Sequence, residues 1–259
     1  MALLAAAQAG PAGAVVGGTP AAPGAYPFMV SLRENGFPYC GGTLMAPQWV
    51  LTAAHCTVGR NLSGLQAVAA QVQRDGGVQQ SSAVDRIVAE PQYNQTTEDY
   101  DAALLHLAAP ITGIAAPRLI AAGDGTGQKP GDLATVIGYG STLAEPASGG
   151  GPVAYPATLQ QAPVALDSDQ QCSNVFNGKS EPAVNTGVML CAGGNGEQDA
   201  CVGDSGGPLL VPASGPGGLL DIGITSWGAG CAVAGIPGVY TRLANSQIAS
   251  FVRSTVAGG

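Results

Sequence analysis

The segment GDSGGP, residues 203–208, places one serine and one aspartate among three glycines. A serine hydroxyl is a poor nucleophile unless a base takes its proton and donors stabilise the oxyanion that forms beside it. Glycines lack a Cβ, so they permit a tight turn and let a substrate carbonyl approach main-chain N–H groups. We therefore expect Ser205 to be a nucleophile, with an oxyanion hole formed chiefly by the amides of Gly203 and Ser205. An ordinary turn is the alternative.

A serine nucleophile needs a base, and the chain has two histidines. His55 ends the segment LTAAH (51–55) after a hydrophobic run, next to Cys56, and we expect it to be the base. His106 lies in the alternating run DAALLHL (101–107), which favours a ring that faces solvent from a strand.

Asp101 opens that same run. A carboxylate directly ahead of apolar residues is carried toward the interior, where it needs a hydrogen-bond donor, and an imidazole N–H supplies one. Asp99 is the alternative partner for His55. Its position beside Glu98 favours an exposed loop instead.

The elements that must position these residues are predicted to be strands. The chain has 259 residues, is 46% hydrophobic and contains 40 glycines and 19 prolines, which is enough for one large core or two small ones. Short apolar or alternating runs between turn residues predict an all-β sandwich or barrel; they lie at 28–32, 49–52, 67–73, 101–107, 133–139, 208–211, 221–227 and 238–242. Leu243, Ile248, Phe251 and Val252 form a helical stripe, which predicts a single helix at the C-terminal end.

Three segments are predicted to lie outside regular structure. Residues 34–38 (ENGFP) and 145–156 are rich in turn residues and are expected to be surface loops. Residues 110–130, where the apolar periodicity lapses, are expected to connect two halves of the chain.

The six cysteines are an even number, and none lies in a CxxC pair of the kind that binds zinc or does redox chemistry. Three disulfides formed in an oxidising compartment are the favoured interpretation, against six buried thiols in a cytosolic protein. Spacing alone leaves 15 pairings open.

The net charge of −8 reflects 9 Lys and Arg against 17 Asp and Glu. With no run of basic residues, nucleic acid is not an expected partner, and no uncharged apolar stretch is long enough to span a bilayer. The first 14 residues, MALLAAAQAGPAGA, resemble the latter part of a secretory signal, although they have no basic leader. With the cysteines, this predicts a secreted protein.

TAAHC, DAALL and GDSGGP, in the chain order His, Asp, Ser, resemble the trypsin/chymotrypsin family of serine endopeptidases. Six cysteines are fewer than many vertebrate members carry, and in this the chain resembles the bacterial secreted members most. The resemblance implies two packed antiparallel six-stranded β-barrels and a C-terminal α-helix, with the catalytic groups between the barrels. The implied protease domain spans 15–259. Its parts are an N-terminal barrel at about 28–115, a C-terminal barrel at about 130–242 and a helix at about 243–253.

The resemblance also implies roles for single residues. Ser205 attacks the scissile carbonyl, His55 moves the proton and Asp101 orients His55. Ser226 supports the buried aspartate, and Trp227 and Gly228 form the strand edge on which substrate backbone pairs. The implied disulfides are Cys40–Cys56, Cys172–Cys191 and Cys201–Cys231.

Asp199 stands where trypsin-like members place the carboxylate at the base of the specificity pocket, which selects Arg or Lys side chains. Gly228 and Gly238 match the glycines that leave the pocket open. Ala200 replaces a serine that helps to bind a lysine ammonium, so we expect Arg to be preferred over Lys. If Asp199 were a solvated loop residue, specificity would be undefined.

VVGG at 15–18 resembles the mature amino terminus of the family, whose freed amine pairs with the aspartate before the nucleophile, here Asp204. Residues 1–14 would then be a signal or activation segment. Because Ala14 precedes Val15, and Arg33 is the first basic residue, a different protease is expected to perform the cleavage.

The expected partners are protein or peptide substrates with Arg or Lys, and proteinaceous inhibitors. We expect a monomer that uses no cofactor and has no readable metal site, although loop carboxylates could hold a structural calcium ion. The alternatives are an active serine endopeptidase of different primary specificity and an inactive homologue that acts as a binding module.

Overall fold

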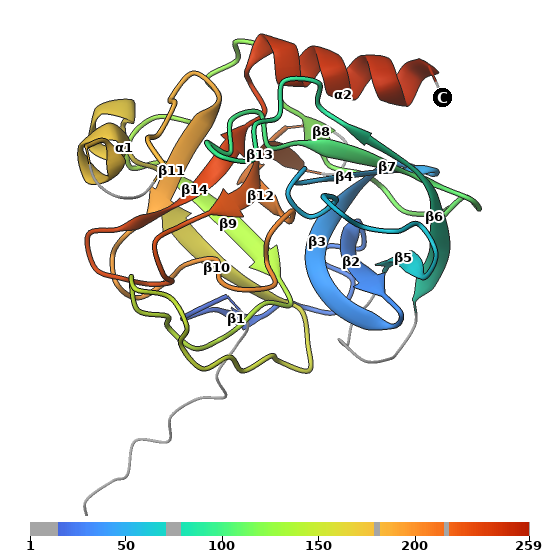
Figure 1. Cartoon of the computed structure of the whole chain (residues 1–259), viewed down its shortest axis with the longest axis horizontal. Helices are drawn as coiled ribbons and strands as arrows, with labels where there is room; N and C mark the ends of the chain where they lie inside the picture. Colours follow the sequence, from blue (N-terminus) through green and yellow to red (C-terminus); the bar gives the residue numbers. More distant parts are fainter. Residues whose placement is uncertain (1–14, 71–78, 179–181, 215–217, 259) are drawn as a thin grey trace, which may run out of the picture.

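The computed structural model describes residues 15–70, 79–178, 182–214 and 218–258. The segment 1–14 and the end of the predicted run 67–73 lie outside these residues. Two β units lie side by side, and the C-terminal helix crosses the top of the view (Figure 1). The strands of the first unit come from the blue to green part of the chain, and those of the second mostly from the later part.

The first unit is a closed antiparallel barrel of six strands in the order β2-β3-β4-β7-β6-β5. Its strands are β2 (Met29–Glu34), β3 (Phe37–Ala46), β4 (Trp49–Thr52), β5 (Leu65–Ala69), β6 (Gln80–Ala89) and β7 (Ala103–Leu107). The pairing of β2 with β5 closes it. All four residues of β4 are buried, as are four of the five residues of β7, so these strands form the core that carries the segments around His55 and Asp101.

The second unit is a curled sheet in the order β1-β10-β9-β12-β13-β14-β11, with β8 added parallel to β13. Its strands are β1 (Thr19–Pro20), β8 (Arg118–Leu119), β9 (Leu133–Gly138), β10 (Gln160–Ala165), β11 (Met189–Gly193), β12 (Pro208–Pro212), β13 (Leu219–Trp227) and β14 (Pro237–Arg242). A bridge between Leu166 and Ala192 brings its β10 and β11 ends together. The predicted two-barrel fold is confirmed, and the second barrel carries two short strands beyond the six expected.

One predicted loop is shorter than expected. Asn35 and Gly36 have φ angles of 52° and 85°, the left-handed values of a two-residue hairpin turn, and they join β2 directly to β3. The strands therefore take up most of the segment 34–38, contrary to the prediction. The predicted loop at 145–156 contains no helix or strand, as expected. The segment 110–130 joins β7 of the barrel to β9 of the second sheet and contains β8.

The C-terminal helix, α2, spans Ser246–Gly258 and buries Ile248 and Val252 on one face. It begins later than the predicted residue 243 because the Asn245 side chain accepts hydrogen bonds from the amides of Gln247 and Ile248, at 2.9 and 3.1 Å. No helix in the described part of the chain is long and apolar enough to cross a membrane.

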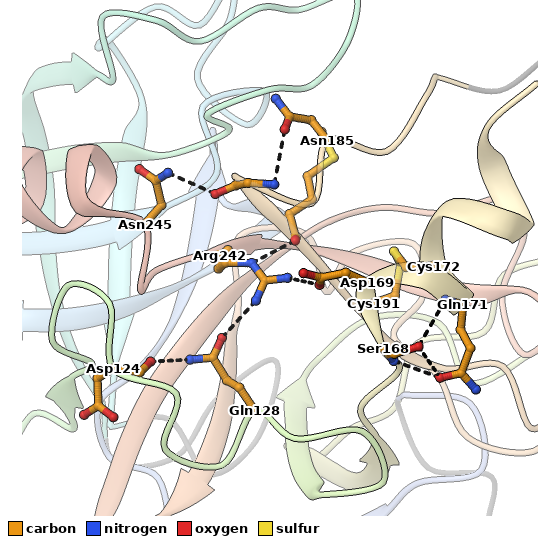
Figure 2. Close-up of polar contacts among 12 residues, drawn as sticks. Asp124, Gln128, Ser168, Asp169, Gln171, Cys172, Asn185, Cys191, Arg242 and Asn245 are labelled. Carbon is orange, nitrogen blue, oxygen red and sulfur yellow. Dashed lines mark hydrogen bonds and ion pairs between the residues drawn. A yellow bond between two sulfur atoms is a disulfide. The ribbon is translucent and has the colours of Figure 1, made fainter.

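The prediction of a single helix is wrong, because α1 spans Asp169–Phe176. Ser168 and Gln171 form a capping box at its start, and Asp169 accepts a hydrogen bond from Arg242 at 2.5 Å (Figure 2). Phe176 is buried at its other end. The Ser-x-x-Gln spacing was the available sequence signal for this helix.

A buried carboxyl group links the two units. Asp221 of β13 is fully buried and accepts a hydrogen bond from Thr43 of β3 at 3.3 Å. Burial raises the pKa of Asp221 to about 8, against the opposing effect of the Gly223 amide and the Thr43 hydroxyl. The folded protein therefore keeps this proton to a higher pH than the unfolded chain does, so the free energy of unfolding falls as the pH rises from about 4 to about 8.

We expect Asp221→Asn to remove up to about 1.4 kcal/mol per pH unit from that slope, because the amide keeps the shape of the neutral acid without its ionisation. Urea unfolding at pH 5 and pH 8, in a Ser205→Ala background that prevents self-digestion, measures the effect. The exposed Glu197 offers a control, since Glu197→Gln should leave the slope unchanged. A slope that Asp221→Asn does not reduce contradicts the prediction.

Candidate active site

Asp101 and His55 meet at the boundary between the two units. The Asp101 Oδ2 atom lies 2.8 Å from His55 Nδ1, and its Oδ1 atom accepts from the His55 amide at 2.9 Å. Ser226 of β13 donates to Oδ2 at 2.5 Å, and Thr241 of β14 donates to the Asp101 carbonyl at 2.7 Å. The carboxylate has no exposed surface. The first barrel therefore supplies the aspartate and the histidine, and the second sheet fixes the aspartate.

The pKa of His55 is raised above its ordinary value. Burial on its own lowers this pKa, but the hydrogen bond to Asp101 and the negative charges of Asp101 and Glu98 outweigh burial. The side chain keeps 27% of its surface exposed, so substrate can reach the imidazole. A half-covered imidazole with a fixed carboxylate partner is suited to accept and return a proton.

Ser205 lies on a turn that packs against the middle of β3, at Gly41, and the end of β4, at Thr52. The Ser205 carbonyl accepts a hydrogen bond from the Gly41 amide at 2.7 Å. The amide of the following residue, Gly206, donates to the Thr225 carbonyl at 2.7 Å. A Cβ on Gly206 would lie 2.2 Å from the Thr52 hydroxyl oxygen, so only glycine fits there. Among the described residues no hydrogen bond joins the Ser205 hydroxyl to His55; in free enzymes this contact is often long.

The turn leaves two amides available. Gly203 has a φ of 98°, and neither its amide nor that of Ser205 donates to a backbone carbonyl within the described chain. Between them lies Asp204, fully buried, which accepts from the amides of Gly140 and Cys201 at 2.8 and 2.9 Å. Burial raises the pKa of Asp204 to about 7, with those two amides opposing the shift. Free amides beside a serine are the donors that an oxyanion requires.

A cavity of about 140 Å³ opens beside Ser205, between segments tied by the Cys201–Cys231 disulfide. Its lining includes Ala200, Ser226, Trp227 and Gly228.

Asp199 precedes Ala200 of this lining and is 2% exposed, which rules out a solvated loop position. Its Oδ2 atom accepts from the Ala232 amide at 2.9 Å, and its Oδ1 atom is buried without a hydrogen-bond partner. Burial raises the pKa of Asp199 to about 7, with the hydrogen bond from the Ala232 amide opposing the shift and the charge of Asp204 adding to it. A Cβ on Gly238 would lie 2.9 Å from that Oδ1 atom, so the glycine leaves room for the carboxylate.

Trp227 is the last residue of β13. The pairing of β13 with β12 ends at Ile224, while Trp227 pairs with Val239 of β14. The strand therefore leaves one side open at Trp227 and Gly228, where an extended peptide can add. The Trp227 ring packs edge-on against Phe176 of α1, with centroids 4.9 Å apart.

The segment after residue 14 lies against the chain around Asp199. Val15 is fully buried, and the Asp199 amide donates to the Val16 carbonyl at 3.2 Å. A Cβ on Gly17 would lie 2.2 Å from the Glu197 carbonyl oxygen, so the close approach requires glycine.

The structure contains the three disulfides that the resemblance implied: Cys40–Cys56, Cys172–Cys191 and Cys201–Cys231. Cys40–Cys56 joins β3 to the residue after His55. Two of the three therefore brace segments next to the site.

His106 and Asp99, the alternatives to His55 and Asp101, bond to other residues. His106 bonds through Nδ1 to Asp85 at 2.6 Å and packs against the Trp49 ring, so it is partly covered rather than fully exposed to solvent. Asp99 accepts from the Thr97 hydroxyl at 3.0 Å within its own turn and is half-buried. Sequence reasoning overlooked Thr241 and Glu98, which both lie close to the Asp101–His55 pair.

Comparisons with known proteins agree with this geometry. The family model described as Trypsin matches residues 15–250. The chain is 38% identical over 231 residues to a trypsin of Saccharopolyspora erythraea, covering 88% of this chain and 93% of that protein. It is 37% identical over 265 residues to trypsin II-P29 of Gallus gallus, covering 98% and 95%. Serine protease 56 of Homo sapiens is 37% identical over 235 residues, which are 90% of this chain but only 37% of that protein.

Proposed function

The chain belongs to the trypsin family of serine endopeptidases, and we propose that it cleaves peptide bonds after arginine and lysine. The observation that carries this specificity is the buried Asp199 carboxylate, unpaired at Oδ1, whose neighbour Ala200 lines the cavity beside Ser205. A buried anion without a cationic partner is costly, and a guanidinium or ammonium group from the substrate offsets that cost.

In the proposed reaction the Ser205 hydroxyl attacks the scissile carbonyl while His55 takes its proton. His55 then gives the proton to the leaving amine, and water releases the acyl group by the reverse path. Asp101 holds His55 in the tautomer whose Nδ1 is protonated and stabilises the imidazolium that forms, as the 2.8 Å contact supports. The amides of Gly203 and Ser205 stabilise the oxyanion.

We expect arginine substrates to be cleaved faster than matched lysine substrates. A guanidinium can donate two hydrogen bonds to one carboxylate, whereas the ammonium of the shorter lysine side chain needs additional acceptors. Ala200 in the cavity lining has no hydroxyl to offer. The kcat/KM values for a pair of amide substrates that differ only in Arg or Lys test this, and equal or inverted values would discard it.

The precursor is proposed to be secreted and activated by cleavage before Val15. The three disulfides are typical of an oxidising compartment. The new amine of Val15 would meet the buried Asp204, whose charge has no cationic partner within the described chain. Because the preceding residue is alanine, a protease other than this one performs the cut.

Labelling with a serine-directed phosphonate tests the proposal. The full chain and a form beginning at Val15 are treated in parallel, and the modified residue is mapped. We expect faster labelling of the Val15 form, at Ser205, and none in Ser205→Ala.

Absence of labelling in both forms favours an inactive homologue. Labelling at Ser205 without hydrolysis of any Arg or Lys amide would indicate another primary specificity. Unaided release of the Val15 terminus by the purified precursor would contradict the requirement for a second protease.

A further inference from the structure

Glu98 places a second carboxylate beside the Asp101–His55 pair. One ring nitrogen of His55 and one carboxylate oxygen each from Glu98 and Asp101 all lie within 4.8 Å of one another. Asp101 is fully buried and occupied by His55 and Ser226. Glu98 is only half-buried, so it is the acidic group of this set that solvent and substrate can reach.

The position of Glu98 is fixed by its turn. Its amide donates to the Asn94 carbonyl at 2.7 Å, and its φ of 56° is a left-handed value that ordinary side chains seldom adopt. The Tyr93 hydroxyl donates to Glu98 Oε2 at 2.9 Å. The carboxylate is therefore held toward the triad rather than left free to rotate into solvent.

No cation of the described chain neutralises this charge. The ion pairs among the described residues join His55 to Asp101, Arg60 to Glu34, His106 to Asp85 and Arg242 to Asp169, and Glu98 is in none of them. A cation from outside can therefore bind Glu98 without displacing an existing ion pair.

We propose that Glu98 is a specificity-determining residue, whose carboxylate binds the side chain of a Lys or Arg immediately preceding the substrate residue held in the Asp199 pocket. Successive side chains of an extended peptide point to opposite sides. When one side chain enters the cavity that Gly228 lines, the preceding one points away from it, and in this proposal it meets Glu98 beside His55, which both lie outside the lining of that cavity. The inference rests on the proposed function and adds to it a preference for substrates with two consecutive basic residues.

Glu98→Gln tests the proposal, because the amide retains the size of the side chain and an acceptor for Tyr93 while removing the charge. Three peptide amides with Lys-Arg, Ala-Arg or Glu-Arg before the cleaved bond are compared on the Val15 form. We expect the wild-type kcat/KM to favour Lys-Arg over Ala-Arg by about three- to tenfold, the size of a partly exposed ion pair. The ratio should fall to about one in Glu98→Gln, and Glu98→Lys should favour Glu-Arg.

The pH profile supplies a measurement that a structural role would leave unchanged. The negative charge of Glu98 raises the pKa of His55, and the base works in its neutral form, above that pKa. Glu98→Gln should therefore shift the acidic limb of the pH profile of kcat/KM to lower pH. Asp99→Asn removes an equal charge from the adjacent residue, whose carboxylate is bonded to Thr97, and should change neither the ratio nor the limb.

Two results would overturn the inference: a Lys-Arg preference that survives Glu98→Gln, or an equal fall on all three substrates with an unmoved acidic limb. Hydrolysis of arginine substrates without regard to the preceding residue would remove this inference and leave the proposed function intact. Failure to hydrolyse any of them, with Ser205 unlabelled, would remove the proposed function itself.

Discussion

Asp101→Asn is expected to lower kcat on arginine amides by about 10⁴-fold, the usual loss when the carboxylate of a Ser-His-Asp triad becomes an amide. The amide of asparagine can donate to Nδ1, which favours the His55 tautomer with its proton on Nε2. That tautomer cannot accept a proton from Ser205. Because the two side chains have the same shape, the His55 amide can still donate to Oδ1, and the Ser226 hydroxyl, which donates to Oδ2 in the parent, can accept from the new NH2 group, so the fold should survive.

The chain supplies a matched control for this substitution. Asp85 bonds to the other histidine, His106, through Nδ1 at 2.6 Å, in a pair that lies on the outside of the barrel. Asp85→Asn breaks a pair of the same chemistry and should leave kcat within about twofold of the parent, as expected for an exposed pair. Similar losses in both variants would show that the effect of Asp101→Asn comes from stability rather than from the tautomer of His55. Thermal unfolding of both variants separates the two causes.

Asp199→Asn is expected to lower kcat/KM on arginine amides by about 10²- to 10³-fold, the cost of leaving a buried cation without its carboxylate. The asparagine side chain can still accept from the Ala232 amide, so the loop around the cavity should keep its shape. Hydrolysis of an amide with an uncharged side chain at the cleaved residue should change by only a few fold. The measured quantity is the ratio between the two substrates.

A second measurement on the parent enzyme follows from the pKa of Asp199, which burial raises to about 7. Arginine binding requires the ionised carboxylate, so KM for arginine amides should rise as the pH falls below 7, and KM for uncharged amides should not. If Asp199→Asn leaves the ratio between arginine and uncharged substrates unchanged, Asp199 does not set the specificity. Phosphonate labelling of Ser205 in the variant checks that the site is still assembled.

Much of this architecture is predictable from the sequence because its signals are local. The run WVLT predicts β4 at its observed bounds, since four consecutive apolar or β-branched residues have no polar side to expose. The triad is predictable for another reason. Each of its residues lies in a short motif, and the order of the motifs along the chain distinguishes this family from others with the same three side chains.

What sequence reasoning missed depends on contacts between distant residues. Thr241 bonds to the carbonyl of a residue 140 positions earlier, and its strand gives no indication of that partner. Glu98 is one acid among several in a polar turn, and only the backbone conformation of that turn directs it to His55. Helix α1 was missed for a local reason, since its eight residues are too few for a clear apolar stripe and its capping box was overlooked.

The catalytic residues come from both β units, so activity also measures whether the two units are correctly docked. Ser226 and Thr241 reach from one unit to an aspartate that belongs to the other, and Ser205 comes from the same side as those two residues. A molecule whose units had slid apart by a few ångströms would retain its strands and disulfides, and far-ultraviolet spectra would report it as native. It would nevertheless hydrolyse nothing. Loss of turnover should thus precede loss of secondary structure when denaturant is added gradually.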